Sequence, residues 1–259
     1  MQTNRRNFLK AAGLAALGFA VVKPALDIFS HSKPAEAALS EGPATAHRFA
    51  MVIDTRACEE AGECTKCIDA CHLTHNVPEM KDKDDEIKWI WEAPYGKVFP
   101  EEEYEFLESD LKNKPVLILC NHCSEPPCVK YCPTRATWKR EEDGIVMIDY
   151  HRCIGCRYCM AGCPYGARSF NWRNPRPFIE EINPDFPTRS RGVVEKCNFC
   201  AERLVNGLLP ACVEACSQKA LTFGDLEDPD SKVREILRTK HFIQRLPELA
   251  THPNVYYLE

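Results

Sequence analysis

The chain contains little glycine, no excess of positive charge and no apolar run of membrane-spanning length. Only 12 of its 259 residues are glycine, against 19 prolines, so its loops are stiff. The formal net charge is −5 and the basic residues are scattered along the chain, which argues against a nucleic acid as partner. An apolar content of 44% is still enough for a packed core, and nothing indicates wholesale disorder.

The common signatures of an enzyme active site are also missing. The sequence has no phosphate-binding glycine loop, no HExxH zinc motif and no Ser-His-Asp order of catalytic residues. We therefore expect no catalytic residues and no substrate site, and the cysteines become the main source of chemistry.

The N-terminus predicts an export signal. Arg5 and Arg6 precede an apolar stretch of 12 residues, AAGLAALGFAVV, which is shorter than the roughly 20 residues of a membrane-spanning helix. The charged segment resembles a twin-arginine signal, and Ala35-Glu36-Ala37 fits a cleavage site. A buried N-terminal helix and a retained membrane tether are the alternatives. The prediction assigns residues 1–37 to the signal and residues 38–48 to a linker.

Sixteen cysteines dominate the composition and fall into four groups of four, with none left over. A random scatter would not divide so evenly. The groups are, in order, Cys58, Cys64, Cys67 and Cys71; Cys120, Cys123, Cys128 and Cys132; Cys153, Cys156, Cys159 and Cys163; and Cys197, Cys200, Cys212 and Cys216.

The third group has the spacing C-x2-C-x2-C-x3-C-P of bacterial ferredoxins. The short gaps let the backbone curl around a 4Fe-4S cluster, so that three thiolates reach three irons. The fourth cysteine, Cys163, points away and ligates a second cluster. Gly155 and Gly162 allow the backbone to approach closely. This spacing predicts an iron–sulfur protein.

The other three groups share the C-x3-C ending of the third. The second group is C-x2-C-x4-C-x3-C and also ends in Cys-Pro, at Cys132-Pro133. The first group has a long opening gap between Cys58 and Cys64, and the fourth has a wide loop before Cys212. The common ending favours four ferredoxin-type groups.

Two other uses of the thiols have weaker support. Four thiolates also suit zinc, but zinc ribbons pair two CxxC knuckles across a longer loop, unlike the third group. Disulfides are expected in an exported chain, yet disulfide frameworks serve small domains without a sufficient core. Export by the twin-arginine route accounts for the thiols, because folded proteins travel with their clusters already inserted in the reducing cytoplasm.

Short apolar runs predict strands beside the cysteine groups. The segments 52–58 and 147–153 repeat the pattern Ile-Asp followed by Cys, and 115–120 is a third strand that ends at a cysteine. The segment 136–149 predicts a hairpin with its turn at Asp143-Gly144. Further predicted elements are strands at 167–172, 220–226 and 254–258 and a helix from 228 to about 244.

These elements predict an α+β fold of duplicated bacterial-type ferredoxin modules with insertions and a C-terminal helical extension. The four-cluster domain is assigned to residues 49–226, with an insertion at 72–119, and the extension to residues 227–259.

Several side chains beside the cysteines have predicted roles. Trp89, Trp91 and Trp172 are expected to pack over a cofactor or an interface, and His72, His122 and His151 are expected to be neighbours rather than ligands, since sixteen thiols already suffice. Four arginines near the third group are candidates for raising cluster potentials, with surface solvation as the alternative: Arg152, Arg157, Arg168 and Arg173.

The four groups together resemble the four-cluster iron–sulfur subunits of the dimethyl sulfoxide, polysulfide and formate-dependent nitrite reductase systems. The likeness covers residues 49–226. Within that family, the long first gap, the HNVPEM…IKWIW segment and the NVYYL tail are most similar to the exported iron–sulfur subunit of DsrMKJOP complexes of dissimilatory sulfur metabolism. The resemblance implies an electron-transfer subunit rather than an enzyme.

The resemblance also implies which thiols share a cluster. The first and fourth groups would hold two clusters between them, and the second and third groups two more. The implied ligand sets are Cys58, Cys64, Cys67 and Cys216; Cys71, Cys197, Cys200 and Cys212; Cys120, Cys123, Cys128 and Cys163; and Cys132, Cys153, Cys156 and Cys159.

The implied partners are a membrane-integral quinone-interacting subunit of the polysulfide reductase type and, for the DsrMKJOP case, a multihaem cytochrome c with other subunits. The chain would be periplasmic and would contact the membrane through these partners. An electron-transfer subunit of a molybdenum, polysulfide or nitrite reductase is the alternative, and a structural zinc protein is an alternative of another class.

Overall fold

A computed structural model describes residues 47–102 and 104–259. The predicted export signal, residues 1–37, and residues 38–46 of the predicted linker lie outside the described residues. Within the described part, no helix combines the length and the apolar character needed to cross a bilayer.

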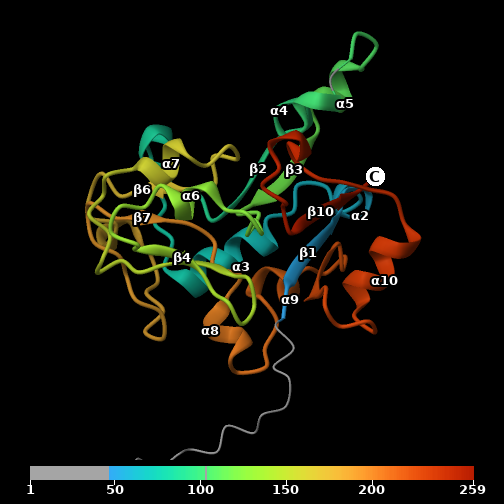
Figure 1. Cartoon of the computed structure of the whole chain (residues 1–259). Helices are drawn as coiled ribbons and strands as arrows, with labels where there is room; N and C mark the ends of the chain where they lie inside the picture. The colour runs from blue at the N-terminus through green and yellow to red at the C-terminus, as the bar shows by residue number, and fades with distance from the viewer. Residues whose placement is uncertain (1–46, 103) are drawn as a thin grey trace, which may run out of the picture. The chain divides into compact units, whose positions relative to one another are not determined.

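A four-stranded sheet contains both the first and the last described strands (Figure 1). Its central strand β1 is buried along Ala50, Met51, Val52 and Ile53, because four consecutive apolar residues can be covered on both faces. Strand β8 pairs antiparallel with β1 on one side, and β10 pairs parallel with it on the other. The strands, in sheet order, are β8 Leu221–Asp225, β1 Phe49–Asp54, β10 Val255–Leu258 and β9 Phe242–Ile243.

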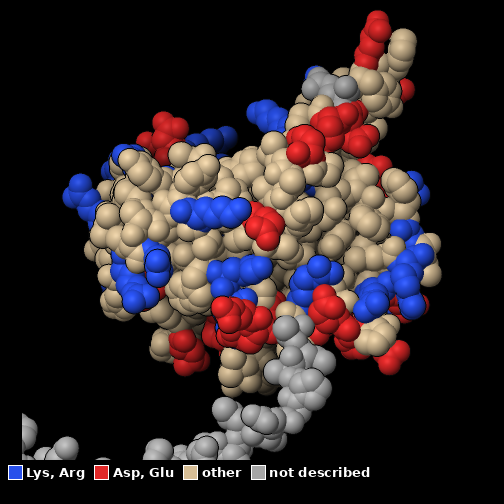
Figure 2. Space-filling view, viewed as in Figure 1, with Lys and Arg blue, Asp and Glu red and all other residues tan. Residues whose placement is uncertain are grey.

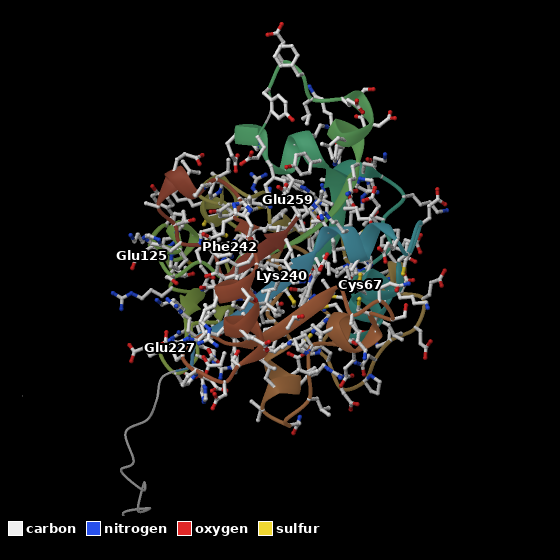
Figure 3. The ribbon with its side chains drawn as sticks, turned by 90° about the vertical axis from the view of Figure 1, so that its right-hand side faces the viewer. Cys67, Glu125, Glu227, Lys240, Phe242 and Glu259 are labelled. Carbon is white, nitrogen blue, oxygen red and sulfur yellow. The ribbon has the colours of Figure 1, made fainter. Side chains whose placement is uncertain are left out.

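The end of the chain is fixed against both this sheet and the middle of the sequence. Leu258 of β10 pairs with Phe242 of β9, and the next residue, Glu259, accepts a hydrogen bond of 2.6 Å from the Tyr95 hydroxyl. Phe242 and Glu259 are labelled in Figure 3. The segment 227–259 therefore supplies two of the four strands of the sheet that contains β1, namely β9 and β10.

The remaining strands form three antiparallel pairs. They are β2 Ile90–Pro94 with β3 Pro115–Leu119, β4 Thr137–Lys139 with β5 Val146–Ile148, and β6 Ser169–Phe170 with β7 Val194–Glu195. Between β2 and β3 the chain forms α4 Tyr95–Val98, η2 Pro100–Glu102 and α5 Ser109–Asn113. Figure 1 shows the α5 segment projecting from the hairpin, and Figure 2 shows acidic side chains gathered on it.

The helices are short, and most of them carry or flank cysteines. The longest, α3 Lys66–His75, buries Cys67, Cys71 and His75, which lie four residues apart on one face. The others are α2 Thr55–Glu59, α6 Pro127–Lys130, α7 Tyr158–Ala161, α8 Ala201–Leu204, α9 Ala211–Ala215 and α10 Lys232–Thr239, with 3-10 turns η1 Lys83–Asp85, η3 Arg176–Phe178 and η4 Pro247–Leu249.

The structure confirms the strands predicted near residues 52, 115, 147, 220 and 254, the 136–149 hairpin and the mixed α and β content. The predicted helix from 228 to about 244 was too long. Its first residues form a turn in which Asp228 accepts from Ser231, and its last residues leave the helix so that Phe242 can pair with Leu258. Strands β7 and β9, of two residues each, were not predicted.

Candidate iron–sulfur sites

All sixteen cysteines lie among the described residues and none of them forms a disulfide there, and the fold gathers them into four sets of four. The members of a set lie close enough to shift one another's pKa or to line one small hollow. Set A is Cys58, Cys64, Cys67 and Cys216; set B is Cys71, Cys197, Cys200 and Cys212; set C is Cys120, Cys123, Cys128 and Cys163; set D is Cys132, Cys153, Cys156 and Cys159.

Set A forms where β1 leads into α2. The Asp54 carboxylate accepts a hydrogen bond of 3.1 Å from the Ala57 N–H and so caps the helix that carries Cys58. Burial, together with the neighbouring thiols Cys58 and Cys216, raises the pKa of Cys67 to about 12.

Set B lies between α3 and α9. Burial first, and then the other three thiols of the set, raise the pKa of Cys71 well above its usual value. Phe199 and Cys200 both have positive φ, of 55° and 52°, so the chain turns tightly here. Backbone N–H groups then reach sulfur: Phe199 donates to Cys197 and Ala211 donates to Cys200, each at 3.4 Å.

Set C begins where strand β3 ends. Cys120 follows that strand, Cys128 lies on α6, and Cys163 enters from the end of α7. Burial, with Cys120 as the next contributor, raises the pKa of Cys123 to about 12.

Set D is built from the ferredoxin-type loop. Gly155 has φ +69°, and a Cβ there would lie 2.2 Å from the Gly192 carbonyl oxygen, so only glycine fits. Although burial opposes it, N–H groups led by that of Thr137 lower the pKa of Cys132. Cys156 is the one cysteine of the sixteen that is exposed.

Each set combines the first three cysteines of one sequence group with the last cysteine of another group. The four sets also form a row, because neighbouring sets contain thiols within electrostatic range. Cys67 faces Cys212 between sets A and B, and Cys197 faces Cys120 between sets B and C. Cys128 faces Cys159 between sets C and D. The structure therefore brings together the same sets that the resemblance implies, and ligation by them stays a prediction.

The donor chemistry of these sets fits an iron–sulfur cluster. Four convergent thiolates are the ligands of 4Fe-4S clusters, and a bound metal offsets their mutual repulsion in a buried site. Sets C and D each line a hollow with their four sulfurs and mainly apolar neighbours such as Val146 and Val194. Sets A to D contain no histidine.

The histidines near the sets have different surroundings. His72 is on α3, and burial lowers its pKa, while His151 is exposed in a turn. His122 is buried and accepts a hydrogen bond of 3.0 Å from the Val146 N–H through Nδ1. Burial and the cations Lys196 and Arg168 keep its pKa well below the usual value. His122 is therefore a neutral neighbour of set C.

His75 is a neighbour of set B that the sequence did not reveal. Its Nδ1 donates to the Cys71 carbonyl at 2.9 Å and its Nε2 donates to Glu202 at 2.8 Å. Burial opposes its charge, but hydrogen bonds with Cys200 and Glu202 outweigh that and raise its pKa to about 9. Its ring stacks on the buried Trp89 at 4.5 Å between ring centroids. Trp89 is thus a packing residue, as predicted.

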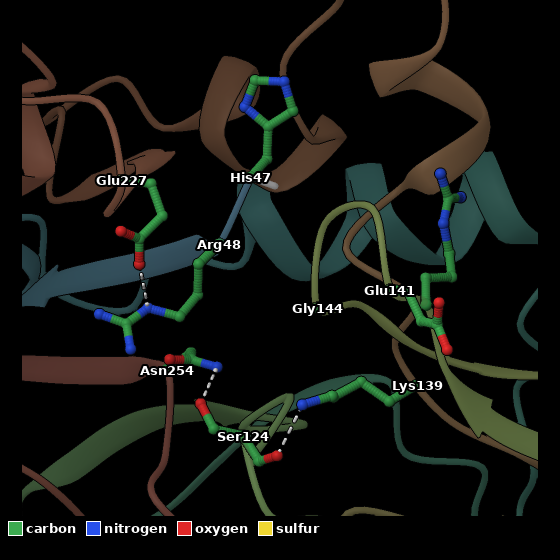
Figure 4. Close-up of a pocket in the computed structure, with 9 residues that line it drawn as sticks. His47, Arg48, Ser124, Lys139, Glu141, Gly144, Glu227 and Asn254 are labelled. Carbon is green, nitrogen blue, oxygen red and sulfur yellow. Dashed lines mark hydrogen bonds and ion pairs between the residues drawn. The ribbon is translucent and has the colours of Figure 1, made fainter. Parts of the chain in front are cut away.

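One hollow of the described residues is lined by no cysteine (Figure 4). Its cations already have partners: Arg48 pairs with Glu227 at 3.3 Å, and Lys139 donates to the Ser124 carbonyl at 2.8 Å. Of these two cations, Arg48 is the one paired with a carboxylate.

Comparison of the sequence with known protein families identifies the class of protein. The chain matches the 4Fe-4S dicluster domain over residues 116–176 and 184–226, which contain the second, third and fourth cysteine groups. The chain is an iron–sulfur protein with a ferredoxin-type 4Fe-4S domain.

Full-length relatives identify the family. The Hdr-like menaquinol oxidoreductase iron-sulfur subunit 1 of Archaeoglobus fulgidus is 39% identical over 277 residues, covering 98% of this chain and 97% of the relative. The NrfC homolog of Haemophilus influenzae is 37% identical, covering 98% and 94%. The B subunit of tetrathionate reductase from Salmonella typhimurium is 34% identical, covering 100% and 89%. The chain belongs to this family of iron–sulfur electron-transfer subunits, which confirms the predicted family and electron-transfer role.

Proposed function

We propose that the chain holds four 4Fe-4S clusters, one in each of sets A to D, within a domain of duplicated ferredoxin modules at residues 49–226. Each cluster, when bound, takes up and gives back one electron at a time. The residues of the chain fix the clusters in a row and set their surroundings, and no side chain acts as a catalyst.

One observation supports this role most strongly: the ends of the row reach the surface while its middle is covered. Set B is wholly buried, and three of the four cysteines of set C are buried. In set D Cys156 is exposed, and in set A Cys58 and Cys64 are half-buried. A row of this kind suits exchange of electrons with one partner at each end.

The surface around set D has the character of a docking site. Ile154 and Tyr158 are 67% and 64% exposed, and Tyr131 and Trp172 are exposed beside them. Tyr131 lies against Gly162, where a Cβ would approach its ring to 2.4 Å. Exposed aromatic and aliphatic side chains of this density favour contact with another protein.

The proposed complex is DsrMKJOP-like, with this chain in the place of its iron–sulfur subunit DsrO. A membrane-integral quinone-interacting subunit of the polysulfide reductase type and a multihaem cytochrome c would be its partners. The name of the menaquinol oxidoreductase relative supports a link to quinone. Export by the twin-arginine route would place the chain in the periplasm, bound to the membrane complex through its partners.

Capture of the intact membrane complex through a tag on this chain tests the proposal. Co-purification of b- and c-type haem with a membrane-integral subunit is expected. Co-purification of a molybdopterin subunit instead would contradict the DsrMKJOP assignment and support the reductase alternative, which the tetrathionate reductase relative favours.

A paired variant tests the docking surface. Tyr158→Glu should reduce recovery of the partner that contacts set D. Val205→Glu alters a similarly exposed apolar side chain at the end of α8 and should not reduce it. Equal recovery with both variants would remove the docking role of the set D surface.

A further inference from the structure

We propose that Arg168 and Lys196 are the fixed countercharges of the set C cluster and raise its midpoint potential. This inference rests on the proposed function, because it requires a cluster in set C. It concerns two buried cations that flank a pair of strands, Arg168 directly before β6 and Lys196 directly after β7, and that lie close to one set of thiols.

Arg168 is buried against the sulfur of set C. Its side chain is 4% exposed, and its Nη2 donates to the Cys128 Sγ at 3.1 Å and to the Thr137 hydroxyl at 2.8 Å. Its Nη1 is buried without a hydrogen-bond partner in the structure. The guanidinium keeps its charge under all ordinary conditions.

Lys196 lies beside the hollow of set C, because it directly follows β7, which pairs with β6 next to Arg168, and it bonds to Val146, which lines that hollow. It directly precedes Cys197 of set B and is 0% exposed. Its Nζ donates to the Cys197 carbonyl at 2.7 Å and to the Val146 carbonyl. Carbonyl oxygens satisfy its N–H groups but supply no negative charge.

Neither cation has a carboxylate partner among residues 47–102 and 104–259. The charged groups that act most on Arg168 are Cys128, Cys159 and Cys120, and those that act most on Lys196 are, in order, Cys120, Arg168, Cys197 and Cys128. The contrast is the neighbouring Arg189, whose Nε pairs with the fully buried Glu195 at 2.6 Å. The fold therefore neutralises one buried cation with an acid and leaves two facing the thiols.

Electrostatics explains why these two cations lack an acid. A buried cation without a partner is destabilising, because it has lost its hydration and gained no opposite charge. A 4Fe-4S cluster with four thiolates carries a charge of about −2 when oxidised and one more negative charge when reduced. It can therefore balance both cations, and the cations favour its reduced form more than its oxidised form.

The two cations share set C but differ in their second neighbour. Both act on Cys120 and Cys128 of set C. Arg168 also acts on Cys159 of set D, and Lys196 also acts on Cys197 of set B. Neutralising Arg168 should therefore lower the potentials of clusters C and D, and neutralising Lys196 should lower those of clusters C and B. Neither change should move cluster A.

The other three arginines named from the sequence are not buried, unpaired cations that face the thiols. Arg152 and Arg173 have largely exposed side chains and pair with Asp149 and Asp85, respectively. Arg157 lies over the Trp172 ring at 4.5 Å from its centroid. Solvent and these partners screen their charge from the clusters.

The test is a redox titration of the loaded full-length chain, followed by electron paramagnetic resonance. The variants are Arg168→Met and Lys196→Met, which remove charge at similar length, and Arg168→Lys, which keeps it. Arg152→Met is the matched control, an exposed cation next to Cys153. Midpoints should become more negative in the Met variants, in the pattern given above, and should stay close to wild type in Arg168→Lys and Arg152→Met.

Each outcome decides the proposal. If Arg168→Met loses the set C cluster and Arg168→Lys retains it, the cluster requires a positive charge at residue 168, as proposed. Unshifted midpoints in Arg168→Met, or the same shift or loss in the Met and Lys variants, overturns it. A wild-type chain without four clusters instead refutes the proposed function, and iron content separates that failure from the others.

Discussion

Cys67 and Cys71 lie one turn apart on α3, yet they belong to different sets. Cys67 faces Cys58 and Cys216 of set A, whereas Cys71 faces the thiols of set B. Residues four apart on a helix share a face, so one helical turn spans the step between two neighbouring sites. The C-x3-C ending common to all four cysteine groups thus has a structural purpose.

This relationship predicts a crossed effect of alanine substitutions. Cys71→Ala should remove the set B cluster and leave set A, although Cys71 belongs to the same sequence group as Cys58, Cys64 and Cys67. Cys67→Ala should remove the set A cluster instead. Iron content should fall by about one quarter in each variant, and the two reduced spectra should lose different signals. Loss of the same signal in both would contradict the crossing.

Gly155 provides a prediction about the loop of set D. Gly155→Ala adds a Cβ that would lie 2.2 Å from the Gly192 carbonyl oxygen, at a residue with φ +69°. We expect a loss of about 3 kcal/mol in the free energy of unfolding and selective loss of the set D cluster.

Gly166→Ala is the matched control for this substitution. Gly166 also has a positive φ, of +64°, but a Cβ there meets no atom within 4 Å. Gly166→Ala should therefore lower the free energy of unfolding by about 1 kcal/mol, the cost of a positive φ alone, and all clusters should remain. Denaturant unfolding with iron analysis measures both effects, and equal losses in the two variants would rule out the steric explanation.

The hydrogen bond from Tyr95 to Glu259 predicts a dependence on alkaline pH. Burial, and then this hydrogen bond, raise the pKa of the Tyr95 phenol. Its contribution to stability is complete below the unfolded pKa of about 10 and is lost as pH rises through the higher folded pKa. Tyr95→Phe should therefore be less stable by about 1 kcal/mol at pH 8, and the difference should narrow above about pH 10. Thermal unfolding at several pH values measures this, and a constant difference would contradict it.

Removal of iron should loosen the contact between α3 and α9 first. Sets A and B both join these helices, and without metal they leave thiols that raise one another's pKa in a buried site. Hydrogen exchange should speed up over 66–75 and 197–216, while β1 keeps its protection because both of its neighbours in the sheet remain. Uniform exchange across both regions would show that the clusters do not organise the fold locally.

The sequence was sufficient where the signal is local. The apolar residues of the segments 52–58, 115–120 and 147–153 predicted strands, and the structure has β1, β3 and β5 there. The spacing of the cysteines likewise reflects local geometry, since the curl of the chain around a cluster requires it.

The sequence was insufficient where distant segments create the structure. The parallel pairing of Val52 with Tyr256 joins residues at opposite ends of the described chain, and the two-residue strands β7 and β9 exist only through their partners. The neighbours Glu195 and Lys196 are a similar case, because the sequence around them does not show that their partners differ. Glu195 pairs with Arg189, whereas Lys196 bonds to the carbonyls of Val146 and Cys197. His75 escaped notice because its partner Glu202 lies 127 residues away.

The most direct test of the central claim is quantitative analysis of the full chain purified without oxygen: iron, sulfide and zinc content, with paramagnetic resonance after dithionite reduction. The account predicts about 16 iron and 16 sulfide per chain and the interacting signals of neighbouring reduced 4Fe-4S clusters. Near-stoichiometric zinc in place of iron, or a reduced sample without a paramagnetic signal, would contradict it.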